Sequence, residues 1–329
     1  MSASSIPPIV KELQAIFEKL PDRELIGKLR GPKRRGRPGY NPRILWRCFV
    51  VYYVLGLPSV SDLVRILYDN PSIAAVCGMH SIAEIPHQST FSRFGSRLAR
   101  PLVRTLVRNV TRALTRALYE RFPDFGKSTA IDSTDIKAWS NGGKKYRGVP
   151  SDSDADWCVK QNTEGNKKYI WGYKVHILCD TQYELPMVVD ISRGNLHDSK
   201  KATPLLRQAR YTYSRFLPDY VICDAGYSSD RLRRAIKIHY KAQPIIDPNP
   251  QHKRAFARTK KTPEWRAIYN RRTAVERLNG RLKAHRRLNS VRVRGKHKVM
   301  IHALLSVIVC QARALAFPDQ VRGCVRSVA

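Results

Sequence analysis

The sequence predicts an α/β fold in which a mixed sheet with flanking helices follows a mainly helical N-terminal part. Up to about residue 120 the apolar residues recur at helical spacing, whereas from residue 128 short β-branched and apolar runs alternate with amphipathic segments. The later order is three strands, then helix, strand, helix, strand and helix, which is typical of a hairpin meander followed by parallel strands with crossover helices. We expect a helical domain over residues 1–120 and an α/β domain over residues 121–329.

An excess of positive charge points to a polyanionic partner. The 329 residues include 60 Lys and Arg against 26 Asp and Glu, which gives a formal net charge of +34. Hydrophobic residues make up 43% of the chain, which excludes a disordered basic tail. A surface charged only for solubility is the alternative, but it needs no such imbalance. Nucleic acid is therefore the expected partner, and its binding should weaken steeply with salt.

Cysteine usage and hydropathy bear on the cellular compartment. The seven cysteines are scattered without a CxxC pair, so we predict neither a zinc site nor a disulfide framework, and a reducing compartment fits. The N-terminus lacks the pattern of a signal peptide. The longest apolar run, residues 299–317, is interrupted by His302, Gln311 and Arg313, which favours a core helix over a membrane span. We expect a cytoplasmic, nucleoid-associated protein without membrane contact.

Two short basic segments of the helical part are candidates for DNA contact. Arg35 and Arg37 lie in an Arg-Gly-Arg-Pro sequence that resembles the core of an AT-hook, which inserts arginines into the minor groove. A flexible basic linker is the alternative. Arg93 and Arg97 lie on a helix that Ser89 can cap, and this helix could form a helix-turn-helix with the helix predicted over residues 59–70. A helical core without DNA binding is the alternative.

A regular arginine stripe marks the helix predicted over residues 100–121. Arginines recur every four residues from Arg100 to Arg116, beside a parallel stripe of apolar residues. Like charges at this spacing repel one another by a few tenths of a kcal/mol, about the size measured for helical pairs. A bound polyanion would relieve that repulsion. The pattern therefore favours DNA contact, with Arg104 and Arg108 at the centre of the stripe, over a solvated face.

Acidic residues that follow two predicted strands are candidates for a metal site. Asp132 follows Thr129-Ala130-Ile131, and Asp224 follows the apolar run of residues 220–223, which is typical of a central parallel strand. Ligands of open α/β sheets bind at the carboxyl ends of the strands, so we expect the two aspartates to face one point. Neighbouring carboxylates repel, and a divalent cation is the natural compensation. Ligation by oxygen alone selects Mg²⁺ or Mn²⁺.

The third ligand should come from the helix predicted over residues 264–288. Tyr269, Arg272, Glu276 and Lys283 stand at offsets of 0, 3, 7 and 14, which places them within an arc of roughly 60° on that helix. Gly280 lies on the same arc and costs about 1 kcal/mol relative to alanine, which suggests a close approach by a backbone or a ligand. Glu276 could be a simple ion-pair partner, but this clustering on one face favours a role in a site.

These motifs resemble those of the DDE transposases of bacterial and archaeal insertion sequences, whose catalytic domain is RNase H-like. AIDSTDIKAW resembles the strand of the first aspartate, RGNLHDSKKATPLL the G-N-x-H-D-S segment, and VICDAGYSS the strand of the second aspartate. Tyr269, Arg272, Glu276 and Lys283 match the signature Y-(2)-R-(3)-E-(6)-K. The resemblance covers most of the chain, and each member of the triad is present.

The resemblance implies metal-dependent DNA strand cleavage and strand transfer at the ends of an insertion sequence. Asp132, Asp224 and Glu276 would hold two Mg²⁺ or Mn²⁺ ions, with Asp132 bridging them. In the same scheme Arg272 and Lys283 bind phosphates of the transposon end, and Tyr269 positions the strand.

The implied partners are double-stranded DNA with terminal inverted repeats, target DNA and a second copy of the chain in a homodimer. Three alternatives remain open at this point: a standalone metal-dependent nuclease, an inactive or domesticated DNA-binding protein, and a structural RNA-binding protein. Trp139 is a candidate to stack on an unpaired base, with a core or loop anchor as its alternative.

Overall fold

The first part of the chain is helical, as predicted. The computed structural model describes residues 6–31, 39–142, 149–161, 166–249, 261–289 and 291–321. Arg35 and Arg37, the AT-hook candidates, lie outside the described residues. The helices of this part are α1 (Pro8–Glu18), α2 (Arg23–Arg30), α3 (Pro42–Val54), α4 (Val60–Asp69), α5 (Pro71–Cys77), α6 (Gln88–Leu98) and α7 (Pro101–Arg121).

Local signals explain most of these boundaries, with two corrections. Ser59 caps α4, because its Oγ accepts a hydrogen bond from the Asp62 backbone N–H at 3.2 Å. The cap of α6 is His87 rather than Ser89: its Nδ1 accepts from the Ser89 N–H at 3.3 Å. The sequence pattern also missed α5, which together with a short 3₁₀ turn (Ile82–Glu84) separates α4 from α6. The two helices of the predicted helix-turn-helix are therefore not consecutive.

The second part forms the predicted mixed sheet. Its strand order is β2-β3-β1-β5-β6, with β4 also paired to β3. β1 is antiparallel to β3 and parallel to β5, and β5 is parallel to β6. β2 falls in a stretch predicted as a loop, because only part of its short sequence alternates. The strands are β1 (Ser128–Lys137), β2 (Asp156–Gln161), β3 (Lys167–Asp180), β4 (Pro186–Arg193), β5 (Tyr220–Cys223) and β6 (Gln243–Ile246).

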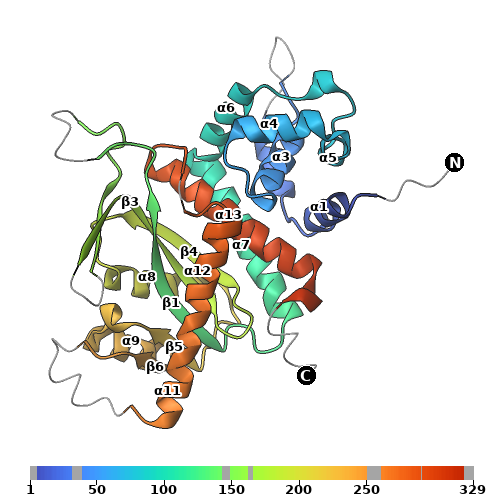
Figure 1. Ribbon diagram of the computed structural model, residues 1–329. Helices are drawn as coiled ribbons and strands as arrows, with labels where there is room; N and C mark the ends of the chain where they lie inside the picture. The colour runs from blue at the N-terminus through green and yellow to red at the C-terminus, as the bar shows by residue number, and fades with distance from the viewer. Residues whose placement is uncertain are drawn as a thin grey trace.

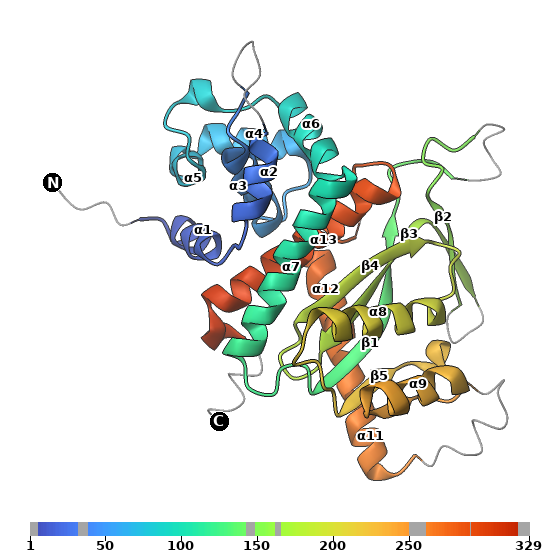
Figure 2. The same ribbon diagram turned by 180° about the vertical axis from the view of Figure 1, so that it is seen from behind.

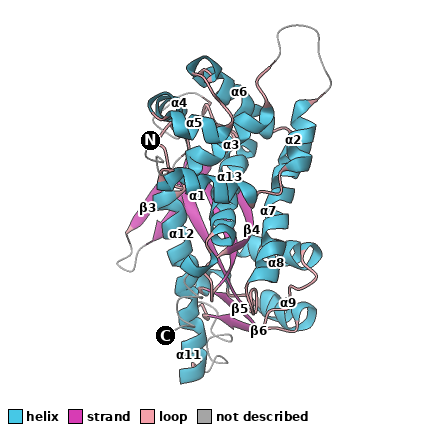
Figure 3. Ribbon diagram, turned by 90° about the vertical axis from the view of Figure 1, so that its right-hand side faces the viewer, coloured by secondary structure: helices cyan, strands magenta, loops and turns pink. Residues whose placement is uncertain are grey.

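Helices cover both faces of this sheet (Figures 1 and 2). One face carries α8 (Ser199–Thr212) and α9 (Asp230–Tyr240). The other carries α12 (Thr273–His285) and α13 (Lys296–Ala316), and α11 (Pro263–Tyr269) leads into α12. The single helix predicted over residues 264–288 is thus divided by a 3₁₀ turn, Asn270–Arg272, although α11 and α12 remain stacked end to end (Figure 3).

The last helix of the chain, α13, joins the two parts. It packs against α7 and β4 and also against α1, α3 and α6 of the helical part. By length and composition α13 is also long and apolar enough to cross a membrane, but 78% of its most apolar window is buried inside the protein, as the prediction of a core helix requires. Because one hydrophobic core runs from α1 to α13, the boundary at residue 120 stays a prediction.

Candidate active site

Two neighbouring strands bring Asp132 and Asp224 side by side. The parallel pairing of β1 with β5 ends at the partners Ile131 and Cys223, so the two aspartates follow at the same level. Successive side chains of a strand point to opposite faces of the sheet. Ile131 and Cys223 belong to the core beneath α8 and α9, so Asp132 and Asp224 point to the opposite face. They therefore share one face, the one covered by α12.

Asp132 does not end its strand, contrary to the prediction. β1 continues to Lys137 because β3 pairs with it along its whole length, whereas β5 pairs only with its first residues. The carboxylate consequently lies at the point where the parallel neighbour stops. The site retains the expected position relative to β5, whose carboxyl end is occupied by Asp224.

Helix α12 lies over this pair and contacts it directly. The Asn279 Nδ2 donates a hydrogen bond to Asp132 Oδ2 at 3.0 Å. Glu276 precedes Asn279 by three residues, on the same side of the helix, and its side chain is 48% exposed. Sequence reasoning missed Asn279, whose 6% exposure and contact with Asp132 are visible only in the structure.

The third carboxylate is bound to an arginine. Glu276 Oε1 accepts a hydrogen bond from Arg272 Nη1 at 2.8 Å. Burial raises the pKa of Asp224 above its ordinary value, and the positive charge of Arg272 partly offsets that rise. Asp224 Oδ1 also accepts the Gly226 backbone N–H at 3.0 Å. The Arg272 guanidinium therefore stabilises both Glu276 and Asp224, and it joins the helix to the end of β5.

The rest of the signature lies along the same helical edge. The rings of Trp265 and Tyr269 stack, with centroids 4.8 Å apart and an interplanar angle of 14°. The Arg272 guanidinium lies 5.5 Å from the centroid of the Tyr269 ring. Lys283 follows Glu276 by seven residues, which is two helical turns. The expectation that Gly280 marks a close approach within the protein is wrong, since a Cβ there would meet no described atom within 4 Å.

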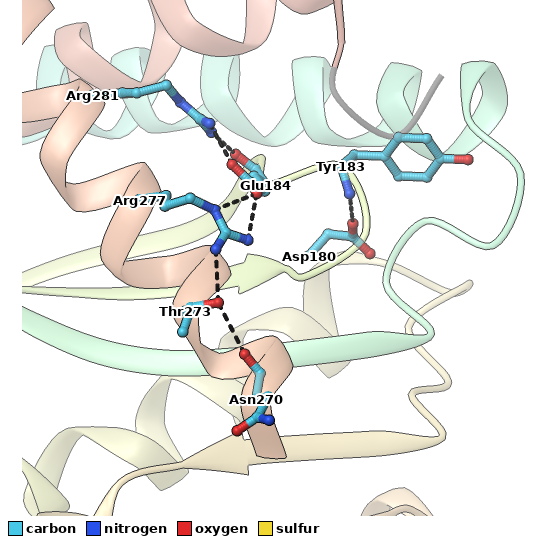
Figure 4. A network of polar contacts seen from close by, with 7 residues as sticks. All are labelled: Asp180, Tyr183, Glu184, Asn270, Thr273, Arg277 and Arg281. Atoms are coloured by element: carbon cyan, nitrogen blue, oxygen red, sulfur yellow. Dashed lines mark hydrogen bonds and ion pairs between the residues drawn. The ribbon is translucent and has the colours of Figure 1, made fainter. Parts of the chain in front are cut away.

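A clamp on the opposite side of α12 fixes the helix against the sheet (Figure 4). Glu184, in the turn between β3 and β4, has a side chain only 2% exposed, and it forms ion pairs with Arg277 and Arg281. Arg277 Nη1 also donates to Thr273 Oγ1 at 2.7 Å. In the same turn Asp180 accepts the Tyr183 N–H at 2.7 Å. These contacts define the position of the helix that carries Glu276 and Asn279.

The arginine stripe of α7 has partners within the protein. Arg104 Nη1 donates to the Ala99 carbonyl at 2.9 Å, and Arg108 lies 3.5 Å from Asp190 on β4. These partners offset the repulsion that the sequence argument assigned to DNA, so DNA contact at Arg104 and Arg108 stays a prediction. Arg93 and Arg97 line an open hollow of about 1040 Å³ beside α6. They too have partners, since Arg97 donates to the Leu29 carbonyl and Arg93 to Thr90 Oγ1 at 3.4 Å.

Asp132, Asp224 and Glu276 are not arranged as a complete set of ligands around one ion. Across the ranges that the structure describes, no three His, Cys, Asp or Glu side chains converge closely enough to hold one ion. Glu276 faces Arg272 instead. The available ligand atoms are all carboxylate oxygens, from Asp132, Asp224 and the nearby Glu276. A hard divalent cation prefers oxygen ligands of this kind. Two carboxylates on one sheet face beneath a basic helix, on a chain of net charge +34, indicate the class of enzymes that act on phosphodiester bonds of nucleic acid.

Comparisons with known proteins make the assignment specific. Residues 124–310, more than half of the chain, match a family model described as the transposase DDE domain. Residues 5–97 match a second model, described as a transposase domain (DUF772). The chain belongs to the DDE transposase family, and it is an enzyme that cleaves DNA and transfers strands, as the sequence predicted. This family generally uses divalent metal ions.

Solved transposase structures also resemble the chain at low identity. A piggyBac transposase synaptic complex with hairpin DNA is 12% identical, with 97% of this chain and 78% of that chain covered and a TM-score of 0.47. The Mos1 strand transfer complex is also 12% identical, with 74% and 98% covered and a TM-score of 0.23. A comparison with curated protein sequences finds no match.

Proposed function

We propose that the chain cuts DNA at the ends of an insertion sequence and joins the ends to target DNA, with Asp132, Asp224 and Glu276 as catalytic carboxylates. The observation that carries the choice of residues is the placement of Asp132 and Asp224 on adjacent strands and one face, beneath α12. Family membership supplies the reaction class. Together they favour a transposase over a standalone nuclease or an inactive DNA-binding protein.

The residues present fit a divalent cation, Mg²⁺ or Mn²⁺. Burial raises the pKa of Asp224, and a cation beside it would stabilise the charged form of this carboxylate. Glu276 would join the site by exchanging its partner Arg272 for the ion. Two bound ions would supply activation of the attacking oxygen and stabilisation of the leaving oxygen.

The residues around the carboxylates would hold the DNA. Arg272 immediately precedes α12 and pairs with Glu276, and Lys283 follows Glu276 by two turns of that helix, so both are placed to bind phosphates near the scissile bond. Tyr269 is held by its stack on Trp265 and can position the strand. Arg93 and Arg97 would contact DNA farther away. The proposed partners are terminal inverted repeats, target DNA and a second copy of the chain.

A cleavage assay tests the proposal. The substrate is a duplex with the inverted repeats that flank the gene, incubated with Mg²⁺. Asp132→Ala, Asp224→Ala and Glu276→Ala should each abolish cleavage and joining while DNA binding is retained. Asp219→Ala is the matched control, because this acid has a side chain 59% exposed and lies before β5, away from the site. Full cleavage by any one of the three site variants would refute the assignment.

A further inference from the structure

Asn279 combines two features that an ordinary buried polar residue lacks. Its side chain is only 6% exposed, and its Nδ2 donates to Asp132 Oδ2 at 3.0 Å. Its Oδ1 is buried and accepts no hydrogen bond from any described residue. A buried amide oxygen without a donor is unfavourable, because it has lost its hydration without compensation. The amide is therefore satisfied at its nitrogen, by Asp132, and left without a described partner at its oxygen.

The structure assigns Asn279 to the catalytic centre as a positioning residue that holds Asp132 for the metal. This inference rests on the proposed function of Asp132. One end of the amide fixes a carboxylate oxygen of Asp132, and the other presents an oxygen that a cation, or a water on it, can satisfy. Residues that orient metal ligands by hydrogen bonds typically change metal affinity by about 10–100-fold when they are replaced.

A near-isosteric substitution of Asn279 should lower metal affinity and leave stability nearly unchanged. Asn279→Leu keeps the volume but removes the donor and the unpaired oxygen, so Mn²⁺ affinity should fall about 10–100-fold while the urea midpoint stays near that of the wild type. A purely structural role predicts the reverse, a lower midpoint with unchanged affinity. Asn109→Leu is the matched control, because Asn109 accepts from Arg112 at 3.1 Å on α7 and should not affect Mn²⁺ binding.

The measurement is calorimetric titration of the DNA-free protein with Mn²⁺, so it does not depend on catalysis. A second variant, Asn279→Asp, brings a carboxylate next to Asp132, and its destabilisation should be reversed by saturating Mn²⁺. Equal Mn²⁺ affinity in the wild type and Asn279→Leu overturns the role of Asn279. Failure of the wild type itself to bind Mn²⁺ counts against the proposed metal site instead.

A second, independent inference concerns a hollow of about 410 Å³. It lies between the helical part and the segment that leads into α13. Its described lining includes five aromatic residues and three Lys or Arg, and it includes no Asp or Glu. Trp139 stands at its rim with a side chain 52% exposed, so it is not a core anchor. The Arg292 guanidinium lies 5.4 Å from its ring, and Arg294 Nε donates to its carbonyl at 2.9 Å.

We propose that this hollow binds an unpaired nucleobase of the DNA substrate. Trp139 offers stacking surface above an apolar floor of buried aromatic side chains that suits no phosphate. Arg292, Arg294 and Lys298 supply cations for the adjoining backbone, and the described lining contains no acid. Trp139 follows Asp132 by seven residues, which is roughly 23 Å along an extended chain. The bound base therefore belongs to a part of the DNA distant from the bond that is cut.

Fluorescence of single-stranded DNA containing 2-aminopurine tests this site. Stacking on Trp139 should quench the fluorescence of 2-aminopurine. Trp139→Ala should remove this quenching and weaken DNA binding about 5- to 150-fold, the effect of losing one stacked base. Trp139→Phe should retain both the quenching and the affinity. Tyr211→Ala, which removes an aromatic side chain 85% exposed on α8, is the control. If bound Trp139→Ala quenches 2-aminopurine fluorescence as strongly as the wild type, the proposal is overturned. This holds even where the variant no longer self-associates. Absence of any DNA binding by the wild type would refute the proposed function instead.

Discussion

Replacement of Glu184 by glutamine tests whether the clamp determines the position of α12. The carboxylate is 2% exposed and accepts charged hydrogen bonds from two arginines, including Arg277 Nε at 2.7 Å. Burial alone would raise its pKa, but hydrogen bonds from Arg277 and Arg281 outweigh burial and hold the pKa below its ordinary value. The folded protein therefore stabilises the charged form, which glutamine cannot supply.

The expected loss of stability is about 2 kcal/mol. Glutamine keeps one acceptor oxygen but presents an NH₂ group to the second guanidinium, so the contact with one of the two arginines is lost; a hydrogen bond to a charged group contributes about 1.5–3 kcal/mol. Full burial of the pair would raise this figure to about 3–5 kcal/mol. Arg277 and Arg281 are 39% and 41% exposed, however, so water compensates part of the loss.

Urea denaturation followed by tryptophan fluorescence measures the change. Glu12→Gln is the matched control, because Glu12 pairs with Arg313 at 2.8 Å but both side chains are more solvated, at 28% and 38% exposure. Surface pairs of this kind contribute about 0–1 kcal/mol. If Glu184→Gln and Glu12→Gln lower the free energy of unfolding equally, the clamp does not depend on a buried charge and our reasoning is wrong.

Three further predictions concern pH and salt. Mn²⁺ binding should weaken as pH falls through the raised pKa of Asp224, because the ligand must be deprotonated; titration calorimetry at several pH values measures this, and a pH-independent affinity would contradict it. Burial raises the pKa of Asp180 to about 6 despite hydrogen bonds from backbone N–H groups, and its ordinary value is about 3.9. The contribution of Asp180 to stability is therefore full below pH of about 4 and is lost as pH rises through about 6. Asp180→Asn should thus gain up to about 3 kcal/mol relative to the wild type between pH 4 and 7, and parallel urea profiles would refute this. Finally, Lys283→Ala should reduce the slope of log affinity for duplex DNA against log salt by about 1, whereas an unchanged slope would place Lys283 away from the phosphates.

Periodicity and spacing predicted the parts of the fold that depend on long, regular patterns. The apolar run before Asp224 identified β5, and the helical offsets of Tyr269, Arg272 and Glu276 identified one shared edge. Short or tertiary features escaped this reasoning. β2 is defined by its pairing with the first residues of β3, and no local pattern shows that pairing.

The same limit applies to the site. The clustering of Tyr269, Arg272 and Glu276 on one helical face selected Glu276 as a site residue. It could not show that the Glu276 carboxylate is paired with Arg272, because an ion pair and a metal ligand are both compatible with this spacing. The repeat of arginines on α7 was assigned to DNA, whereas Arg104 and Arg108 have partners inside the protein. Asn279 was missed because its importance lies in a contact with Asp132, 147 residues away in the sequence.

The ion pair between Arg272 and Glu276 links metal binding to DNA binding. Without metal, the guanidinium pairs with Glu276 at 2.8 Å, and its charge partly offsets the rise that burial causes in the pKa of nearby Asp224. A divalent ion held by the carboxylates would take over this neutralisation, and Arg272 would then be available for a phosphate. Such coupling is reciprocal, so DNA should raise metal affinity by the same factor as metal raises DNA affinity.

This coupling can be measured with Ca²⁺ or Mn²⁺ and a DNA end that cannot be cleaved. Binding of that DNA by the wild type should strengthen with the metal, by about 5- to 150-fold for a typical coupling free energy. In Arg272→Ala the metal-free affinity should be little changed, because the guanidinium is then engaged by Glu276, while the gain from metal should be largely lost. A variant that loses affinity equally with and without metal would show that Arg272 binds DNA independently of Glu276. The ion pair would then be a stabilising contact alone, without a part in ordering metal and DNA binding.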